Sequence, residues 1–205
     1  MKLLKKVSAI EVKRCFVFGD FIRHKETTLH GMKSLSPEAY VKQVKKAREV
    51  ILELPDVMID LMFKGQWHKR YLALTKADWY LAIADTTEVG VWKGAGSLPK
   101  KWTEGSVKET ADFVRDALNH HKTNLLKGRS HTAIEGIIKS ALPWVQKEKY
   151  LFPIAFKGGT GTHGRRGLKL MKGDIDDGCM RSIALAVSGK KKIKLYFGVP
   201  KKKGK

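Results

Sequence analysis

The chain has 205 residues, and 42% of them are hydrophobic, which is enough to bury a substantial core and excludes a chain that is disordered throughout. Lys and Arg number 41 against 20 Asp and Glu, a formal net charge of +21. A small domain needs a net charge of only about 2–8 to stay in solution, so this excess predicts a polyanionic partner. No run of about 18 apolar residues occurs, and no membrane-spanning helix is expected.

The first half of the chain is predicted to mix short strands and helices. Residues 15–22 are rich in aromatic and β-branched side chains and predict a strand. Pro37 stands where a first helical residue belongs, and the apolar spacing behind it predicts a helix over 36–54. A short apolar run predicts a second strand over 57–63, and a less regular pattern predicts a helix over 75–85.

Two helices and a strand are expected in the middle of the chain. A capping-box spacing, Ser-x-x-Glu, predicts a helix over 106–118, because each of the two side chains can bind the backbone N–H of the other. A second such spacing, Thr-x-x-Glu, predicts a helix over 132–142 that Pro143 ends. A short apolar run predicts a strand over 150–156.

The last two elements are a helix over 177–188, capped by Asp176, and a half-buried strand over 193–199. Because helices and strands are mixed along the chain, the fold class is α/β or α+β, a mixed sheet with about four to five helices packed on it. We expect residues 1–199 to form a single globular domain and residues 200–205 to form a disordered, lysine-rich tail.

The two cysteines, Cys15 and Cys179, stand among apolar residues, which predicts two reduced thiols in the core rather than a disulfide. The first residues contain no long apolar run, so no signal peptide is expected. These features favour a cytoplasmic protein or, if the chain is viral or from a phage, one inside the host cell or its nucleus.

The C-terminal quarter is the basic pole of the chain, since residues 157–205 hold 14 Lys and Arg and 3 Asp, a net +11. Five glycines between 158 and 167 predict an irregular loop whose consecutive N–H groups can bind an anion. Its Gly-Gly-Thr-Gly-Thr string, 158–162, resembles the glycine loop of the tubulin and bacterial cell-division GTPase family. The basic residues expected to bind phosphate here are Lys157, Arg165, Arg166, Lys169, Lys172, Lys190, Lys191 and Lys192.

Three carboxylates, Asp174, Asp176 and Asp177, follow this loop within four residues. Charges this close repel one another unless a helix N-terminus or a divalent metal compensates them, and Mg²⁺ binds one or two carboxylates together with phosphates. Residues 173–188 resemble the Asp-x-Asp-Asn helix start of the phage-type Holliday-junction resolvases. That family has a further aspartate downstream, whereas this chain has no acid after Asp177.

Aromatic side chains stand among basic ones at several points of the chain. Trp67 and Trp102 lie in polar stretches and are the tryptophans expected to be exposed. Because the bases of a single strand stack on exposed aromatic rings, both residues join the predicted nucleic-acid-binding set.

Together these features predict a nucleic-acid-binding protein that makes mainly phosphate-backbone contacts to DNA or RNA, with no cofactor and no membrane partner. The first alternative is a Mg²⁺-dependent nuclease resembling the junction resolvases. Its catalytic residues would be Asp174, Asp176 and Asp177, the first two holding the metal, and Asp20 or Asp60 would supply a further carboxylate. The second alternative is a viral capsid or nucleoprotein subunit, which predicts a homo-oligomer.

Overall fold

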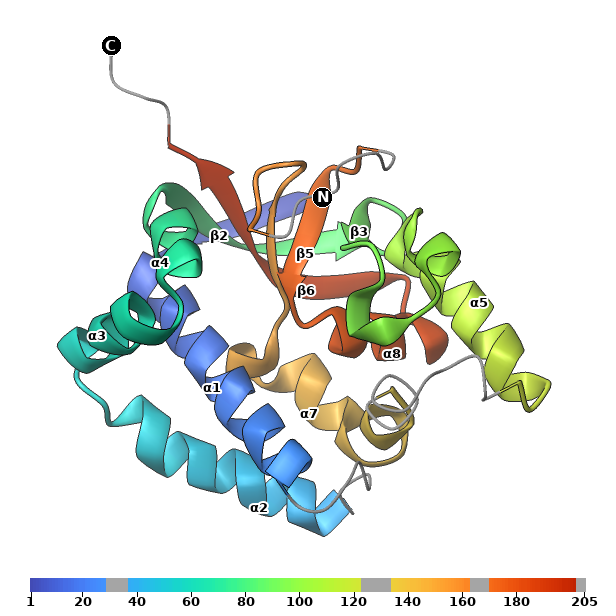
Figure 1. Cartoon of the computed structure of the whole chain (residues 1–205), viewed down its shortest axis with the longest axis horizontal. Helices are drawn as coiled ribbons and strands as arrows, with labels where there is room; N and C mark the ends of the chain where they lie inside the picture. Colours follow the sequence, from blue (N-terminus) through green and yellow to red (C-terminus); the bar gives the residue numbers. More distant parts are fainter. Residues whose placement is uncertain (29–36, 123–133, 163–169, 202–205) are drawn as a thin grey trace.

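A computed structural model describes residues 1–28, 37–122, 134–162 and 170–201. It is built on one six-stranded sheet with the strand order β1-β2-β6-β4-β5-β3 (Figure 1). In chain order the strands are β1 (Lys2–Val7), β2 (Ala77–Asp85), β3 (Val89–Val91), β4 (Ile154–Lys157), β5 (Gly173–Asp177) and β6 (Lys192–Pro200). The sheet is mixed, because β6 runs parallel to β4 and antiparallel to β2, and the fold belongs to the expected α+β class.

Helices surround this sheet on both sides of the molecule. Helices α1–α4 gather at one end, whereas α5 and α8 pack together at the other, with α7 between the two groups (Figure 1). No helix in the described segments is both long and apolar enough to cross a bilayer. The helices are α1 (Ala9–Thr28), α2 (Pro37–Ala47), α3 (Asp56–Gln66), α4 (His68–Thr75), α5 (Val107–Asn119), α7 (Leu142–Lys147) and α8 (Cys179–Val187).

Five short helical turns complete the described elements. The π-helical turns follow α2 and precede α7, and the others are 3-10 turns. They are η1 (Arg48–Leu52), η2 (Ala95–Ser97), η3 (Lys100–Thr103), η5 (Ile137–Ala141) and η6 (Lys149–Leu151).

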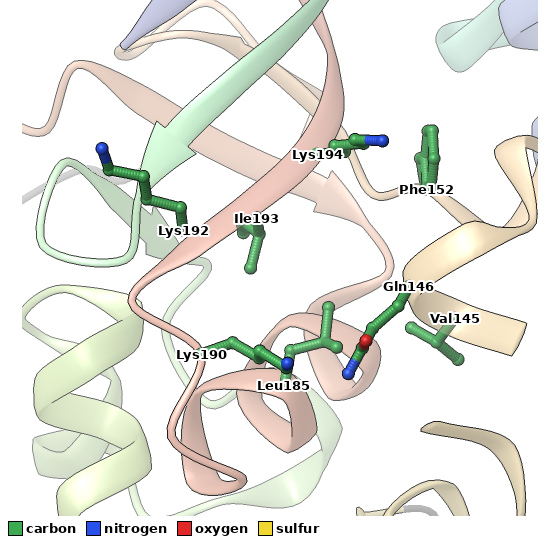
Figure 2. Close-up of a pocket in the computed structure, with 8 residues that line it drawn as sticks. All are labelled: Val145, Gln146, Phe152, Leu185, Lys190, Lys192, Ile193 and Lys194. Atoms are coloured by element: carbon green, nitrogen blue, oxygen red, sulfur yellow. The ribbon is translucent and has the colours of Figure 1, made fainter. Parts of the chain in front are cut away.

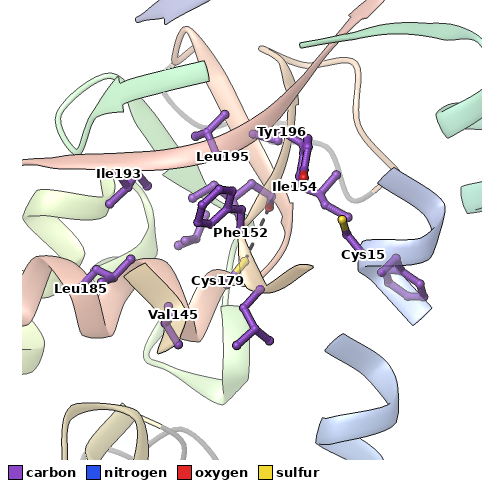
Figure 3. Close-up of a cluster of buried hydrophobic side chains, with 14 of the residues drawn as sticks. Cys15, Val145, Phe152, Ile154, Cys179, Leu185, Ile193, Leu195 and Tyr196 are labelled. Atoms are coloured by element: carbon purple, nitrogen blue, oxygen red, sulfur yellow. Dashed lines mark hydrogen bonds between the residues drawn. The ribbon is translucent and has the colours of Figure 1, made fainter. Parts of the chain in front are cut away.

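The buried hydrophobic side chains form one cluster that reaches from the sheet into the helices. Figure 3 shows the part between β6 and the helices α7 and α8, where Ile193 and Leu195 face Leu185 and Val145. Tyr196 lies on the opposite side of β6, and its hydroxyl donates a hydrogen bond to the carboxylate of Glu11 at 3.0 Å. The two faces of β6 therefore pack their buried residues against different layers, as the alternating sequence predicts.

Three helices and one strand confirm the sequence prediction, and the third of these helices, α8, covers most of the predicted 177–188. The helix behind Pro37 forms as α2 and continues through η1. The capping box of α5 is complete, since Ser106 accepts from the N–H of Glu109 and Glu109 accepts from that of Ser106. Strand β6 covers the predicted 193–199.

Three predictions in the first half were wrong. Residues 15–22 lie in helix α1 and residues 57–63 in helix α3, whereas most of 75–85 forms strand β2. A short apolar run fits both the two-residue repeat of a strand and the 3.6-residue repeat of a helix. The elements packed around it therefore decide which of the two forms. Strand β2 has hydrogen-bonded neighbours on both edges, whereas α1 packs against the helices α2, α3 and α4.

Three predictions in the second half need correction. Pro143 does not end a helix but lies in the first turn of α7, where its missing N–H costs nothing. Only the end of 150–156 is strand, because η6 precedes β4. Asp176 belongs to β5 and caps no helix, because Gly178, with a left-handed backbone (φ +84°), separates β5 from α8.

Candidate nucleic-acid interface

The three predicted acids lie on strand β5 with only 5%, 5% and 7% of Asp174, Asp176 and Asp177 exposed. Asp176 is bound from two directions. The Arg70 Nε of helix α4 donates to its Oδ2 at 2.8 Å, and the Thr162 N–H donates to its Oδ1 at 3.0 Å, together with the Thr162 hydroxyl. The charge of Asp176 is therefore compensated by a cation and by a loop of the protein itself.

The other two acids are also held by protein donors. Asp174 accepts a hydrogen bond from the Gly159 N–H at 2.5 Å. Asp177 is paired with the Arg181 guanidinium of α8 at 2.7 Å, one helical turn along the chain. The charges of the three clustered carboxylates are thus balanced by two arginines and two loop amides.

In the part of the predicted anion-binding loop that the structure describes, two amides are taken up by the protein itself. Its amides at Gly159 and Thr162 donate to Asp174 and Asp176, so the anions are internal carboxylates. Lys157 is exposed at the end of β4, and its carbonyl accepts the N–H and the hydroxyl of Thr160. The remaining predicted loop residues, Arg165, Arg166 and Lys169, lie outside the described residues.

A divalent metal would need several ligands at one point. Among the described residues, no group of three His, Cys, Asp or Glu side chains is placed to hold one. The two further carboxylates proposed from the sequence, Asp20 and Asp60, lie on α1 and α3, and Asp60 accepts from the buried Lys13 at 2.7 Å.

Two of the predicted lysines flank the turn over 86–88, between β2 and β3. The Lys172 ammonium lies 2.7 Å from the Glu88 carboxylate, and the Lys191 carbonyl accepts the N–H of Thr86 at 2.9 Å. The hydrogen bond from Lys172, with that from the N-terminal ammonium, lowers the pKa of Glu88 from 4.5 to about 2. Lys172 and Lys191 are thus brought to one surface from segments that are separate in the sequence.

A groove between β6, α7 and α8 joins Lys190 and Lys192 to Lys194, and its volume is about 170 Å³. We call it the lysine groove. Figure 2 shows Lys194 extending toward Phe152, and Gln146 close to Leu185 and Lys190. The groove is lined by Val145, Gln146, Phe152, Leu185, Lys190, Lys192, Ile193 and Lys194.

The two predicted tryptophans differ in their surroundings. Trp67 is half-buried and lies edge-on to Phe16, with the ring centroids 5.1 Å apart, so it anchors α4 to α1. Trp102 is half-buried and stacked on Phe113, with centroids 5.8 Å apart and ring planes within 9°. Because 47% of Phe113 is exposed, this second pair presents an aromatic surface to solvent.

Sequence reasoning missed Lys194, Gln146 and Phe152 in the groove, and Arg70 beside the acids. Lys194 could have been found, because alternation along β6 places it on the same side as Lys192. The others come from distant segments and carry no local signal. Searches of family models, curated proteins and solved structures gave no match to this chain. Functional inference therefore rests on this geometry.

Proposed function

We propose that this protein binds nucleic acid mainly through its phosphate backbone, with the lysine groove as the central contact. One observation carries the proposal. Among the described residues, no carboxylate lies within 4.0 Å of the ammonium groups of Lys190, Lys192 or Lys194. Some exposed lysines, such as Lys108 and Lys172, do have an acidic partner, whereas others, such as those of α2, have none in the described part of the chain. The groove differs from the latter in being a hollow of the surface. The groove therefore presents uncompensated positive charge.

A polyanion explains such a cluster physically. Ammonium groups carried by so short a segment as 190–194 repel one another, and this repulsion is relieved when phosphates bind them. Binding also releases the counterions condensed on the nucleic acid, which makes affinity fall steeply with salt. Lysine acts as a hydrated point charge, so these contacts carry no base preference of their own.

The proposed surface extends beyond the groove. Lys191 is exposed beside it, and Lys172 lies at the same turn, 86–88. Lys157 and the loop residues Arg165, Arg166 and Lys169 are proposed as further phosphate contacts, because they belong to the same basic quarter of the chain. Trp102 supports the proposal through its exposed partner Phe113, whereas the packing of Trp67 favours a structural role.

The test is the binding of labelled duplex DNA across a salt series, followed by fluorescence anisotropy. We expect replacement of Lys190, Lys192 and Lys194 by Ala to make the fall of log K with log salt shallower by about 2.7, since each phosphate contact contributes roughly 0.9 to the slope. The matched control replaces three exposed lysines of α2, Lys42, Lys45 and Lys46, and removes the same charge. Equal losses in both variants would show that only net charge matters and would reject the groove.

The nuclease alternative is tested in the same samples. We keep it as a second proposal because Asp174 and Asp176 share one face of β5 and adjoin the loop. Cleavage with Mg²⁺ that stops with EDTA and with Asp176→Asn would support it. Asn preserves the size of the side chain and can still accept from Thr162, but its NH2 group then faces the Arg70 Nε–H, so urea denaturation of the variant must show that it is folded under the assay conditions. Intact substrate under all conditions would contradict the nuclease proposal and leave nucleic-acid binding as the proposed function.

The capsid or nucleoprotein alternative requires contact between copies of the chain. Helix α3 supports it, because Val57, Met58 and Leu61 are 63%, 44% and 54% exposed on its outer side. Apolar side chains gathered at a surface commonly mark an interface. Light scattering after size exclusion should then give an oligomer that Leu61→Glu dissociates, whereas a monomer at all concentrations would contradict this proposal.

A further inference from the structure

Strand β6 is paired along its whole length on one side only, with β2. At one end of this ladder the Thr86 N–H donates to the Lys191 carbonyl at 2.9 Å. In an antiparallel ladder every second residue directs both its N–H and its C=O to the partner strand, so the odd-numbered residues of β6 bond to β2. The N–H and C=O groups of Lys192 and Lys194 therefore point away from β2.

On that other side, β4 covers only the second half of β6. Ile154 is paired with Tyr196, and the Tyr196 N–H donates to the Pro153 carbonyl at 2.8 Å. The next bond of this parallel ladder would run from the N–H of position 153 to the Lys194 carbonyl, but proline has no N–H. Pro153 therefore ends the pairing. Among the described residues, no hydrogen bond reaches the backbone of Lys192 or Lys194 from this side.

This open stretch of β6 borders the lysine groove. Figure 2 shows it on one side of the groove, with Gln146 and Phe152 on the other. Each of its two lysines presents a backbone N–H donor and a backbone C=O acceptor, an alternation that another extended peptide backbone complements. A phosphate offers acceptors only, so it would leave the two carbonyls without donors. The edge therefore favours a peptide strand over a nucleic acid.

The side chains beside this edge specify the charge of such a strand. Lys192 and Lys194 are exposed, and no carboxylate of the described segments lies within 4.0 Å of either ammonium. Side chains two residues apart lie on the same side of a strand. Acidic residues at alternate positions of an added strand would thus face both lysines, and opposite charges stabilise such cross-strand pairs. A second copy of β6 would instead bring lysines against lysines.

We propose that β6 at Lys192–Lys194 is a docking edge for an acidic, extended segment of a partner protein, which adds a strand in the place that β4 leaves at Pro153. Strand addition of this kind takes its affinity from backbone hydrogen bonds and its specificity from alternate side chains. The inference goes beyond the proposed function. Because phosphates and acidic side chains would use the same lysines, the segment would compete with nucleic acid for the groove.

The probe is a capped peptide with Glu at alternate positions, Glu-Thr-Glu-Thr-Glu, followed by amide hydrogen exchange in NMR spectra of the protein. In the free protein, the amides of Lys192 and Lys194 should exchange quickly, and those of Ile193 and Leu195, bound to β2, slowly. Saturating peptide should slow exchange at the two lysines. The matched control peptide is N-methylated on the amides that face β6, so it keeps every charge but loses those donors. It should bind on the order of tenfold more weakly.

A pair of variants tests the same edge from the side of the protein. Lys194→Pro and Lys194→Ala remove the same charge, and only proline also removes the N–H that faces the groove. Proline is tolerated where the N–H takes no part in a ladder, as on an edge strand. We expect Lys194→Pro to bind the peptide on the order of tenfold more weakly than Lys194→Ala.

Equal binding of the two peptides would show that charge alone holds the ligand and would overturn the docking edge. Slow exchange of Lys192 and Lys194 in the free protein would overturn it too, and so would equal protection of both amides by oligo-dT. The peptide comparison uses the unaltered protein, so it remains decisive if Lys194→Pro fails to fold. No binding of either peptide at low salt would overturn this inference alone, because the salt series with duplex DNA tests the proposed function separately.

Discussion

Arg70 and Asp176 are 106 positions apart in the chain, yet the Arg70 Nε lies 2.8 Å from the Asp176 Oδ2, with 17% and 2% of the two side chains exposed. The same guanidinium lies over the Phe16 ring, 4.4 Å from its centroid. This pair joins helix α4 to strand β5 and gives a buried carboxylate its cation. Breaking a buried pair from one side leaves a charge without its partner.

We therefore expect Arg70→Ala to lower the free energy of unfolding by about 3 kcal/mol, because Asp176 is left buried without its cation. Urea denaturation measures this loss. The control is Lys108→Ala, which breaks an exposed pair with Asp112 and should cost under about 1 kcal/mol. Similar losses in both variants would show that the Arg70–Asp176 pair contributes no more than a surface pair.

The low pKa of Glu88 predicts a pH dependence. Its pKa falls from 4.5 in the unfolded chain to about 2 in the folded protein, so the native state holds the charged form more firmly. This stabilisation is fully present above pH 4.5 and is lost as the pH falls toward 2. Glu88→Gln should cost on the order of 1 kcal/mol at pH 6, given the exposed Lys172 partner, and progressively less at lower pH.

Urea denaturation of both proteins from pH 6 to pH 3 gives the difference directly. A constant difference over this range would mean that Glu88 titrates normally and that its ion pair with Lys172 does not form in solution.

Gly198 predicts a steric effect in the middle of the sheet. A Cβ at this position would lie 2.7 Å from the Trp79 ring, which is buried and donates its N–H to the Leu74 carbonyl. Gly198→Ala should therefore destabilise the protein by about 1–3 kcal/mol, as overpacking does. Gly65→Ala in α3 is the control, because no atom lies within 4 Å of the added methyl, and it should stabilise the helix slightly.

The two cysteines predict a slow chemical reaction. Both thiols are free and buried, and burial raises the pKa of Cys179 to about 12 and that of Cys15 still further above its usual 9.0. Because the thiolate is the reactive form, alkylation of the native protein should be on the order of 100-fold slower than in urea. Because both pKa values lie well above 9, the thiolate fraction and with it the rate should still rise about tenfold per pH unit between pH 7 and 9, without levelling off. Rapid labelling of native protein would place either thiol at the surface.

The parts of the fold that sequence reasoning predicted are those with local signals. Ser106 and Glu109 cap α5 through contacts within one turn, and the alternation along β6 needs no knowledge of its neighbours. Helix α1 was misassigned because it is buried on several sides, so its apolar residues do not form one stripe. Strand β2 was predicted as a helix because its hydrogen-bonded pairing with β1 and β6 joins distant segments and leaves no local pattern in the sequence.

The candidate site divides in the same way. The charge run from Lys190 to Lys192 is visible in the sequence, whereas the buried Val145, Phe152 and Leu185 that line the groove are brought together only by the fold. The acids were seen as a cluster, but their compensation by Arg70 depends on a contact between distant segments. Local sequence patterns therefore show where charged residues lie, whereas tertiary packing determines which partners those charges have.

The loop over 158–162 should cost more free energy to open than most surface loops do. Surface loops normally exchange their amide hydrogens quickly, because they open with little cost in free energy. Here Gly159 and Thr162 donate to Asp174 and Asp176, so opening the loop removes donors from two buried charges. These two amides should exchange at rates closer to those of the core strands, which makes this loop part of the cooperative folding unit of β5.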